Sequence, residues 1–166
     1  MSDRRAKVEL YLIRHADAGD PEAWTRPDAE RPLSDKGRRQ AERLGRHLAA
    51  LEFAPDVILA SPKVRAVETA RLVADALGRP VSEDERLAGP LGLDTLEEMV
   101  GDAGSPRRVV LVGHDPDFSE LLSELAGAPG LAMRKGALAR VDVEGRIRPG
   151  SGVLRWVLPP DLVPSG

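Results

Sequence analysis

Short apolar runs that alternate with helical patterns constrain the fold of this chain most strongly. The clearest runs are residues 7–13, 56–60 and 108–113; two more strands are expected near 137–143 and 153–158, and a brief one at 80–82. Runs of this length that are apolar and rich in β-branched residues are typical of buried strands. Because the strands alternate with helices along the chain, the sequence predicts an α/β fold. We expect a three-layer α/β/α sandwich around a mostly parallel central sheet.

Between these predicted strands, apolar residues recur at the spacing of an α-helix. Ser34 is a suitable N-cap for a helix over residues 35–51, whose apolar side chains fall on one face. A second helix is expected from Ser61-Pro62 to about Gly78, and a short one from about residue 94. A fourth helix carries its apolar residues at core-facing spacing, namely Phe118, Leu121, Leu122 and Leu125.

Length and charge set the class of protein. A chain of 166 residues suits a single domain, of which residues 1–7 and 159–166 are expected to fray. No apolar run approaches the ~20 residues that span a bilayer, and a formal net charge of -3 does not indicate a nucleic-acid binder. There is no cysteine, which excludes disulfides, thiolate metal sites and cysteine nucleophiles. We expect a cytoplasmic enzyme that binds neither nucleic acid nor membrane.

Polar side chains follow three of the predicted strands at the point where each strand ends. Arg14 and His15 follow the first strand, Ser61 follows the second, and His114 follows the strand at 108–113. Arg65 falls in the first turn of the helix after Ser61. Because ligands of such sheets bind beyond the carboxyl ends of the strands, we expect these side chains to meet at one edge.

These residue types are suited to phosphoryl chemistry. A neutral histidine such as His15 can attack phosphorus, and the resulting phosphoramidate is labile enough to hydrolyse. The guanidinium groups of Arg14 and Arg65 match phosphoryl oxygens, and His114 can donate a hydrogen bond to one. Taken singly, each residue could instead be structural, since arginine supplies all but four of the 24 basic residues.

A metal site is the alternative use of these histidines. Asp17, Asp115 and Asp117 could complete a set of carboxylate and imidazole ligands. Two arginines beside the same histidines would oppose a cation and favour an anion. We therefore expect no metal and no cofactor.

Four segments in register resemble the histidine phosphatase superfamily, also called the phosphoglycerate-mutase-like family. They are Leu-Ile-Arg-His at 12–15, the segment at 31–37 that opens the first helix, the segment Ser-Pro-Lys-Val-Arg-Ala-Val-Glu-Thr-Ala at 61–70, and Val-Leu-Val-Gly-His at 110–114. The resemblance implies the phosphoglycerate-mutase-like fold and a covalent phosphohistidine on His15. It also implies a phosphate pocket of Arg14, Arg65 and His114, with Ser61 and Asp17 as weaker candidates.

Within that superfamily the chain looks like the short SixA phosphohistidine phosphatases. The features are Arg-His-Ala-Asp-Ala at 14–18, Gly-His-Asp-Pro at 113–116, and a short connection before His114. This resemblance implies a phosphorylated substrate, such as a signalling protein that carries phosphohistidine. No carboxylate stands out as a general acid, although Asp17 and residues 83–85 are candidates; a P–N substrate needs such an acid least. A small-molecule phosphomonoesterase or mutase, or a non-catalytic phosphoanion-binding module, are the alternatives.

Overall fold

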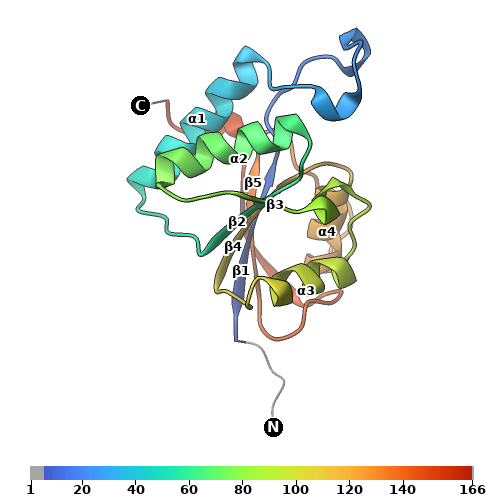
Figure 1. Cartoon of the computed structure of the whole chain (residues 1–166). Helices are drawn as coiled ribbons and strands as arrows, with labels where there is room; N and C mark the ends of the chain where they lie inside the picture. The colour runs from blue at the N-terminus through green and yellow to red at the C-terminus, as the bar shows by residue number, and fades with distance from the viewer. Residues whose placement is uncertain (1–5, 166) are drawn as a thin grey trace.

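A six-stranded sheet forms the centre of the molecule in the computed structural model, which describes residues 6–165 (Figure 1). Its strands are β1 (Val8–Arg14), β2 (Val57–Ala60), β3 (Ser82–Glu83), β4 (Arg108–Gly113), β5 (Leu138–Val143) and β6 (Gly152–Leu158), in the spatial order β3-β2-β4-β1-β5-β6. The pairings among β3, β2, β4 and β1 are parallel, whereas β5 and β6 add antiparallel pairings at one side. The predicted mostly parallel sheet is confirmed.

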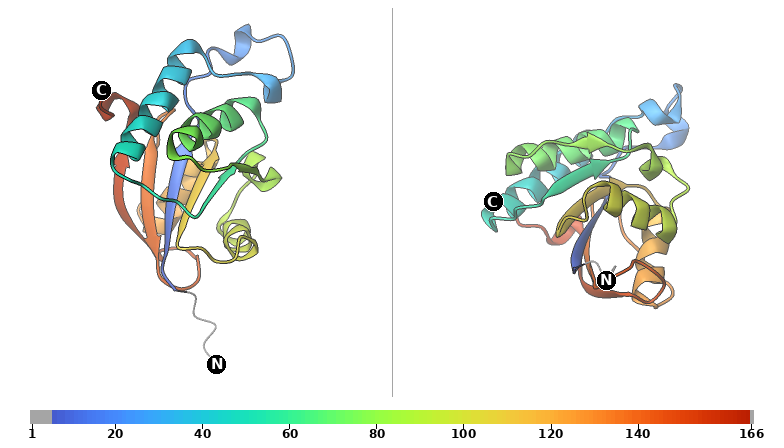
Figure 2. Two further views of the ribbon diagram at one scale, coloured as in Figure 1. Left: turned by 60° about the vertical axis from the view of Figure 1, so that its left-hand side comes forward. Right: turned by 60° about the horizontal axis from the view of Figure 1, so that its bottom comes forward.

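Two layers of helices cover the sheet. The helices are α1 (Asp35–Ala50), α2 (Val64–Leu77), α3 (Leu93–Asp102) and α4 (Asp117–Ala126). One hydrophobic cluster joins α1 and α2 to alternate residues of the sheet, and a second joins α3 and α4 to the residues between them. The two views of Figure 2 show these pairs of helices on opposite sides of the strands. The three-layer α/β/α sandwich is therefore confirmed.

Local sequence explains how α1 begins. Ser34 is its N-cap, and its Oγ accepts a hydrogen bond from the Gly37 amide at 3.0 Å. Gly37 has no side chain where the helix passes the backbone of Asp17, since an added Cβ would overlap the Asp17 carbonyl group. The segment 31–37 therefore fixes the first helix against the chain that follows β1.

The start of α2 differs from the prediction. Lys63 is its N-cap and makes no side-chain capping bond, so the helix begins two residues beyond Ser61-Pro62. Ser61 Oγ accepts the Lys63 amide at 3.3 Å instead. The helix ends at Gly78, whose positive φ of 65° lies in the left-handed region that glycine adopts without strain.

The connecting segments hold more structure than their composition suggests. The loop after β1 contains two 3-10 turns, η1 (Pro21–Ala23) and η2 (Asp28–Glu30), and a third, η3 (Glu85–Ala88), precedes α3. The tail expected to fray at 159–166 contains η4 (Pro160–Leu162), and Val163 after it is buried against the α1–α2 face. Residues 1–5 and 166 of the segments expected to fray lie outside the described residues.

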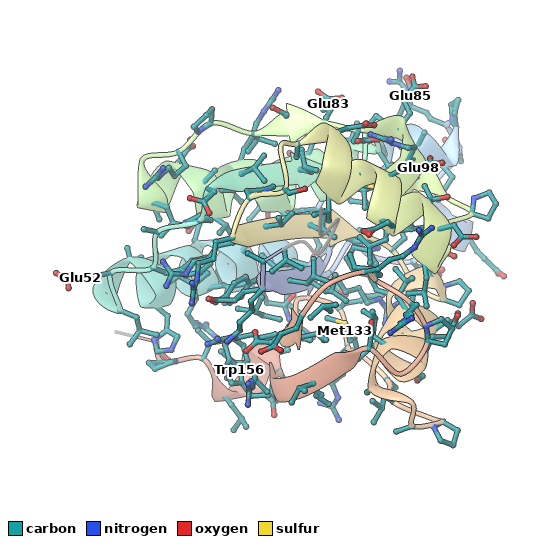
Figure 3. All side chains as sticks on the ribbon, turned by 90° about the horizontal axis from the view of Figure 1, so that it is seen from below. Glu52, Glu83, Glu85, Glu98, Met133 and Trp156 are labelled. Atoms are coloured by element: carbon teal, nitrogen blue, oxygen red, sulfur yellow. The ribbon has the colours of Figure 1, made fainter. Side chains whose placement is uncertain are left out.

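Strand β6 forms an edge of the sheet and leaves apolar side chains at the surface. Trp156, labelled on this strand in Figure 3, is 40% exposed. Within residues 6–165, no helix combines the length and the apolar character needed to pass through a lipid bilayer.

Candidate functional site

Three neighbouring strands end at the same edge of the sheet and bring the candidate residues together. The register pairs Arg14 of β1 with Gly113 of β4, and the His15 amide donates to the Gly113 carbonyl at 2.9 Å. On the other side of β4, the Ser61 amide donates to the Val112 carbonyl at 3.0 Å. These bonds place His15, Ser61 and His114 side by side, as predicted. The loop at 16–34 lies at this end of the sheet, away from the N-terminus (Figure 1).

His15 is buried and held in one tautomer. Its side chain is 6% exposed, and Nδ1 lies 2.8 Å from the Ala16 carbonyl oxygen. Because a carbonyl oxygen can only accept, Nδ1 carries the proton and Nε2 keeps its lone pair. Burial, assisted by the charges of Arg65 and Arg14, lowers the pKa of His15 to about 4, although the Ala16 hydrogen bond opposes the shift. The imidazole is therefore a neutral nucleophile near pH 7.

His114 faces His15 from the neighbouring strand, with ring centroids 5.3 Å apart. Its Nε2 lies 2.7 Å from Ser61 Oγ. Burial lowers the pKa of His114 to about 3, assisted by the charge that His15 acquires once it is protonated in acid and by the charge on Lys63. Gly113 before it allows close packing, since an added Cβ would stand 2.7 Å from the ring of Phe118. The site thus contains two neutral imidazoles.

Arg14 is held by the opposite wall of the site. Its Nη1 donates to the Met133 carbonyl oxygen at 2.8 Å and lies 3.4 Å from Asp115 Oδ2. Ser119 ties these partners together: its Oγ donates to Asp115 Oδ2 at 2.6 Å and accepts from the Met133 amide at 2.9 Å. Asp115 therefore forms an ion pair with Arg14.

Arg65 is held by a residue that the sequence motifs do not include. Asp28, in η2, accepts from Arg65 Nη1 through its carbonyl oxygen and from Nη2 through Oδ2, both at 2.9 Å. The same carboxylate accepts from Arg31 Nε at 3.2 Å through Oδ1. Nothing in the sequence distinguishes Asp28 from the other acidic residues of the loop. Its contact with Arg65 arises only when the loop folds back over α2.

Three buried side-chain nitrogen atoms at this site have no hydrogen-bond partner. Within residues 6–165, the buried side-chain nitrogen atoms that lack a hydrogen bond are Arg14 Nε, Arg65 Nε and His114 Nδ1. An unsatisfied buried polar group costs about 1–3 kcal/mol, and more when it is charged. All three atoms belong to one cluster around His15. Such a cluster is suited to an anion that accepts several hydrogen bonds at once.

Asp17, the weaker candidate, lies beside the site as an ionised carboxylate. Its Oδ2 accepts from Ser34 Oγ at 2.6 Å and from the Gly19 amide at 3.3 Å. The Ser34 hydrogen bond, against a raising effect of burial, holds the pKa of Asp17 below its usual value. A carboxyl group of this kind is a poor proton donor near pH 7.

The donor set also bears on the metal alternative. Guanidinium N–H groups cannot ligate a cation, and Arg14 and Arg65 keep their positive charge at any physiological pH. In the part of the chain that the structure describes, no three His, Asp or Glu side chains are grouped as metal ligands. The residues present at this edge therefore fit an anion rather than a cation.

Comparisons with known proteins agree with this geometry. The model of the histidine phosphatase superfamily (branch 1) matches residues 10–89. An uncharacterized protein of Picosynechococcus sp. is 36% identical over 124 residues, which are 72% of this chain and 73% of the relative. The phosphohistidine phosphatase SixA of Escherichia coli is 25% identical over 158 residues, 92% of this chain and 94% of SixA.

The fold is also found among solved structures. The structure of the protein histidine phosphatase SixA complexed with tungstate matches this chain with a TM-score of 0.79 at 22% sequence identity. The match covers 93% of this chain and 98% of the SixA chain. The phosphoglycerate-mutase-like fold is thus confirmed. With the family model matching the segments that hold Arg14, His15 and Arg65, the chain belongs to the histidine phosphatase superfamily and is a phosphatase.

Proposed function

We propose that this phosphatase removes phosphate from phosphohistidine on proteins, through a covalent phosphohistidine on His15 and without a metal ion. The observation that carries the proposal is the cluster of unpartnered buried donors, Arg14 Nε, Arg65 Nε and His114 Nδ1, around a histidine whose Nε2 lone pair is free. A phosphoryl group is the anion that both satisfies these donors and reacts with this nucleophile.

In the first step, Nε2 of His15 attacks phosphorus and forms a P–N bond. The bond between phosphorus and the substrate's imidazole breaks, and its electron pair stays on that imidazole. The substrate reacts in the form whose other ring nitrogen carries a proton, which for an ordinary imidazole pKa of about 6.5 is about a quarter of the molecules at pH 7. From that form the ring leaves as neutral imidazole. Arg14 and Arg65 stabilise the charge on the equatorial phosphoryl oxygens during the transfer.

In the second step, water attacks the phosphorus of the phosphorylated His15. The P–Nε2 bond breaks, and its electron pair returns to Nε2. Because Nδ1 keeps the proton that it donates to the Ala16 carbonyl, His15 leaves as a neutral ring. Both protons of the water remain on the product, dihydrogen phosphate.

His114 has the geometry of a donor to the phosphoryl group. Ser61 Oγ already accepts the Lys63 amide, so its hydroxyl proton is available to His114 Nε2. Nδ1 then carries the ring proton and, having no partner in the protein, can donate it in a hydrogen bond to a phosphoryl oxygen. Neutral His114 therefore contributes a dipole where the two arginines contribute charge.

The proton balance favours a P–N substrate over a phosphate ester. An alkoxide leaving group needs a general acid, whereas a protonated imidazole does not. Asp17 is the acidic residue nearest to His15 in sequence, and the Ser34 hydrogen bond keeps it ionised. A phosphohistidine substrate supplies the missing proton itself. The likeness to SixA, a phosphohistidine phosphatase, supports the same substrate class.

The test is to trap and map the phosphoenzyme. The protein is incubated with radiolabelled phosphoramidate, quenched in alkali, digested and mapped, with and without a metal chelator. We expect acid-labile label on His15 in both samples, and none in His15→Ala. Label on another residue, or turnover that survives His15→Ala, would overturn the nucleophile; loss of label with the chelator would overturn metal independence. Equal kcat/KM for phosphohistidine and alkyl phosphates would contradict the substrate class.

A further inference from the structure

A basic groove adjoins the anion pocket. It has a volume of about 600 Å³, and Arg14 lines it together with α1, the loop before β5 and the start of η4. Six cationic side chains face it against two carboxylates, Asp17 and Asp161; the cations are Arg14, Lys36, Arg39, Arg43, Arg134 and Lys135. Because Arg14 also holds one of the unpartnered donors of the anion pocket, the two sites are continuous.

The spacing of cationic residues along α1 explains one wall of the groove. Lys36, Arg39 and Arg43 are spaced at i, i+3 and i+7, which places them on one face of the helix. At a rise of 1.5 Å per residue, this stripe extends about 10 Å along the helix. Arg134 and Lys135 face it from the loop that also holds the Arg14 partner Met133. The positive charges thus form two walls that begin beside the phosphate site.

Most of these charges are not neutralised by the protein. Asp161 pairs with Arg134 at 3.8 Å. The ionised Asp17 carboxylate, which accepts a hydrogen bond from Ser34, offsets part of the charge of Lys36 and Lys135. Within residues 6–165, the structure contains no ion pair for the other cations that line the groove beyond Arg14, namely Lys36, Arg39, Arg43 and Lys135. The chain as a whole has a net charge of -3, so this excess of positive charge is local. A local excess on an acidic protein attracts an acidic ligand to that place.

The lining of the groove indicates the kind of acidic ligand. Among the described residues, the lining contains no aromatic side chain on which a base could stack, and Pro160 is the only apolar residue in it. Sites for small organic ligands are mostly apolar and enclosed, with few polar groups. Here long, flexible cationic side chains are spread over about 10 Å, the length of about three residues of extended polypeptide. Carboxylates spaced along a peptide fit this arrangement.

We propose that the groove binds an acidic segment of the same polypeptide that carries the phosphorylated side chain, and so selects among protein substrates. This inference rests on the proposed function, because it assumes a phosphorylated protein in the anion pocket. The acidic segment adds screened ion pairs outside the pocket, and its contribution decreases with salt.

Two phosphohistidine peptides test the proposal, one with aspartates beside the phosphorylated residue and one with asparagines. We expect the protein to hydrolyse both, with a kcat/KM about tenfold higher for the acidic peptide at low salt. The preference should fall to about twofold or less at about 0.5 M NaCl. K36Q/R39Q/R43Q should lose the preference. R79Q/R146Q/R148Q removes the same charge from exposed positions outside the groove and should keep it.

The outcomes separate this inference from the proposed function. If both peptides are hydrolysed equally well, or the preference survives K36Q/R39Q/R43Q, the groove does not select acidic substrates and the inference is wrong. If tripolyphosphate inhibition weakens in that variant while the peptide preference does not, the groove binds a small polyanion and the inference is also wrong. If neither peptide is hydrolysed although phosphoramidate still labels His15, the protein-phosphohistidine function itself fails.

Discussion

Within residues 6–165, two buried clusters of polar and charged side chains differ in whether their hydrogen-bonding groups have partners in the protein. At the far end of β1 from the anion pocket, Glu9 and Asp142 are paired across β1 and β5 and are 2% and 4% exposed. Cations surround both carboxylates: Arg107, Arg108 and Arg140 for Glu9, and Lys7, Arg140 and Arg155 for Asp142. The Tyr11 hydroxyl group also donates to Glu9, at 2.6 Å.

The difference between the clusters indicates their functions. Around Glu9 and Asp142 the protein supplies its own donors, so this cluster is complete without a ligand. Around His15 it leaves donors of Arg14, Arg65 and His114 unpaired, which is costly unless an anion binds. A saturated cluster contributes to stability, whereas an unsaturated one is available for chemistry.

Replacing the nucleophile should have the largest effect. His15→Ala should reduce kcat for phosphoramidate by about a thousandfold or more, because the proposed mechanism passes the phosphoryl group through His15 Nε2. Asp142→Asn, which alters the saturated cluster, should leave kcat/KM within about twofold. Steady-state release of inorganic phosphate measures both. A large loss of activity in Asp142→Asn would show that the two clusters are not independent.

Removing one charge from the anion pocket should have the next largest effect. Arg65→Gln should lower kcat/KM by about a hundredfold, the usual loss for one preorganised donor to developing charge. Its free energy of unfolding in urea, measured without phosphate, should fall by no more than about 1 kcal/mol, because the lost pair with the exposed Asp28 carboxylate is offset by removal of a buried cation whose Nε is unpaired. A variant that loses stability and activity together would indicate a structural role for Arg65.

The sequence predicted the sheet edge well because strand ends are local features. Apolar runs stop at Arg14 and before His114, and parallel strands carry such ends to one place. The motif at 61–66 likewise located Arg65 at the start of α2. These parts of the site depend on backbone periodicity, which a single sequence records.

The rest of the site depends on contacts between distant segments. Asp28 reaches Arg65 across 37 positions, and the Met133 carbonyl reaches Arg14 across 119. The sequence cannot indicate which backbone carbonyl will accept a hydrogen bond, because every residue has one. It also cannot single out one aspartate in a loop that contains several acidic residues. The tail after β6 was expected to be loose for the same reason, because the burial of Val163 depends on side chains far along the chain.

The two clusters should lose stability in different ranges of pH. The folded-state pKa values of His15 and His114, about 4 and 3, lie below the usual 6.5, so the unfolded chain takes up protons first and stability falls as pH decreases from 6.5 to about 4. For Asp142, burial raises the pKa, but hydrogen bonds from Arg140 and Arg155 outweigh it and lower the value from 3.8 to about 2. Its stabilisation is complete above pH 3.8 and is lost as pH falls through about 2.

Urea unfolding across pH, in buffers without phosphate, separates these ranges. The loss between pH 6.5 and 4 should be about 2 kcal/mol or more, and Asp142 should account for about 1–2 kcal/mol below pH 3.8. His114→Gln should reduce the first loss and Asp142→Asn the second. If His114→Gln leaves the first range unchanged, His114 is not held neutral by its burial.

The smallest effect on kcat/KM is expected from Asp28, an exposed carboxylate that pairs with a buried arginine of the anion pocket. The Asp28 carboxylate is 55% exposed and pairs with the buried guanidinium of Arg65, leaving Nε directed elsewhere without a partner. We infer that Asp28 positions Arg65 for the phosphoryl group. Asp28→Asn should lower kcat/KM by about threefold, because the exposed pair is worth under about 1 kcal/mol and the carbonyl contact to Nη1 remains.

Glu30→Gln is the matched control for Asp28→Asn, since Glu30 lies in the same 3-10 turn and pairs with Arg26 at 3.6 Å. It should change kcat/KM by less than a factor of about 1.5, which is the low end of what exposed ion pairs contribute. The inhibition constant of inorganic phosphate distinguishes positioning from competition. If Asp28 positions Arg65, phosphate binds more weakly to Asp28→Asn; tighter binding with a higher kcat/KM would mean that the carboxylate competes with substrate for Arg65.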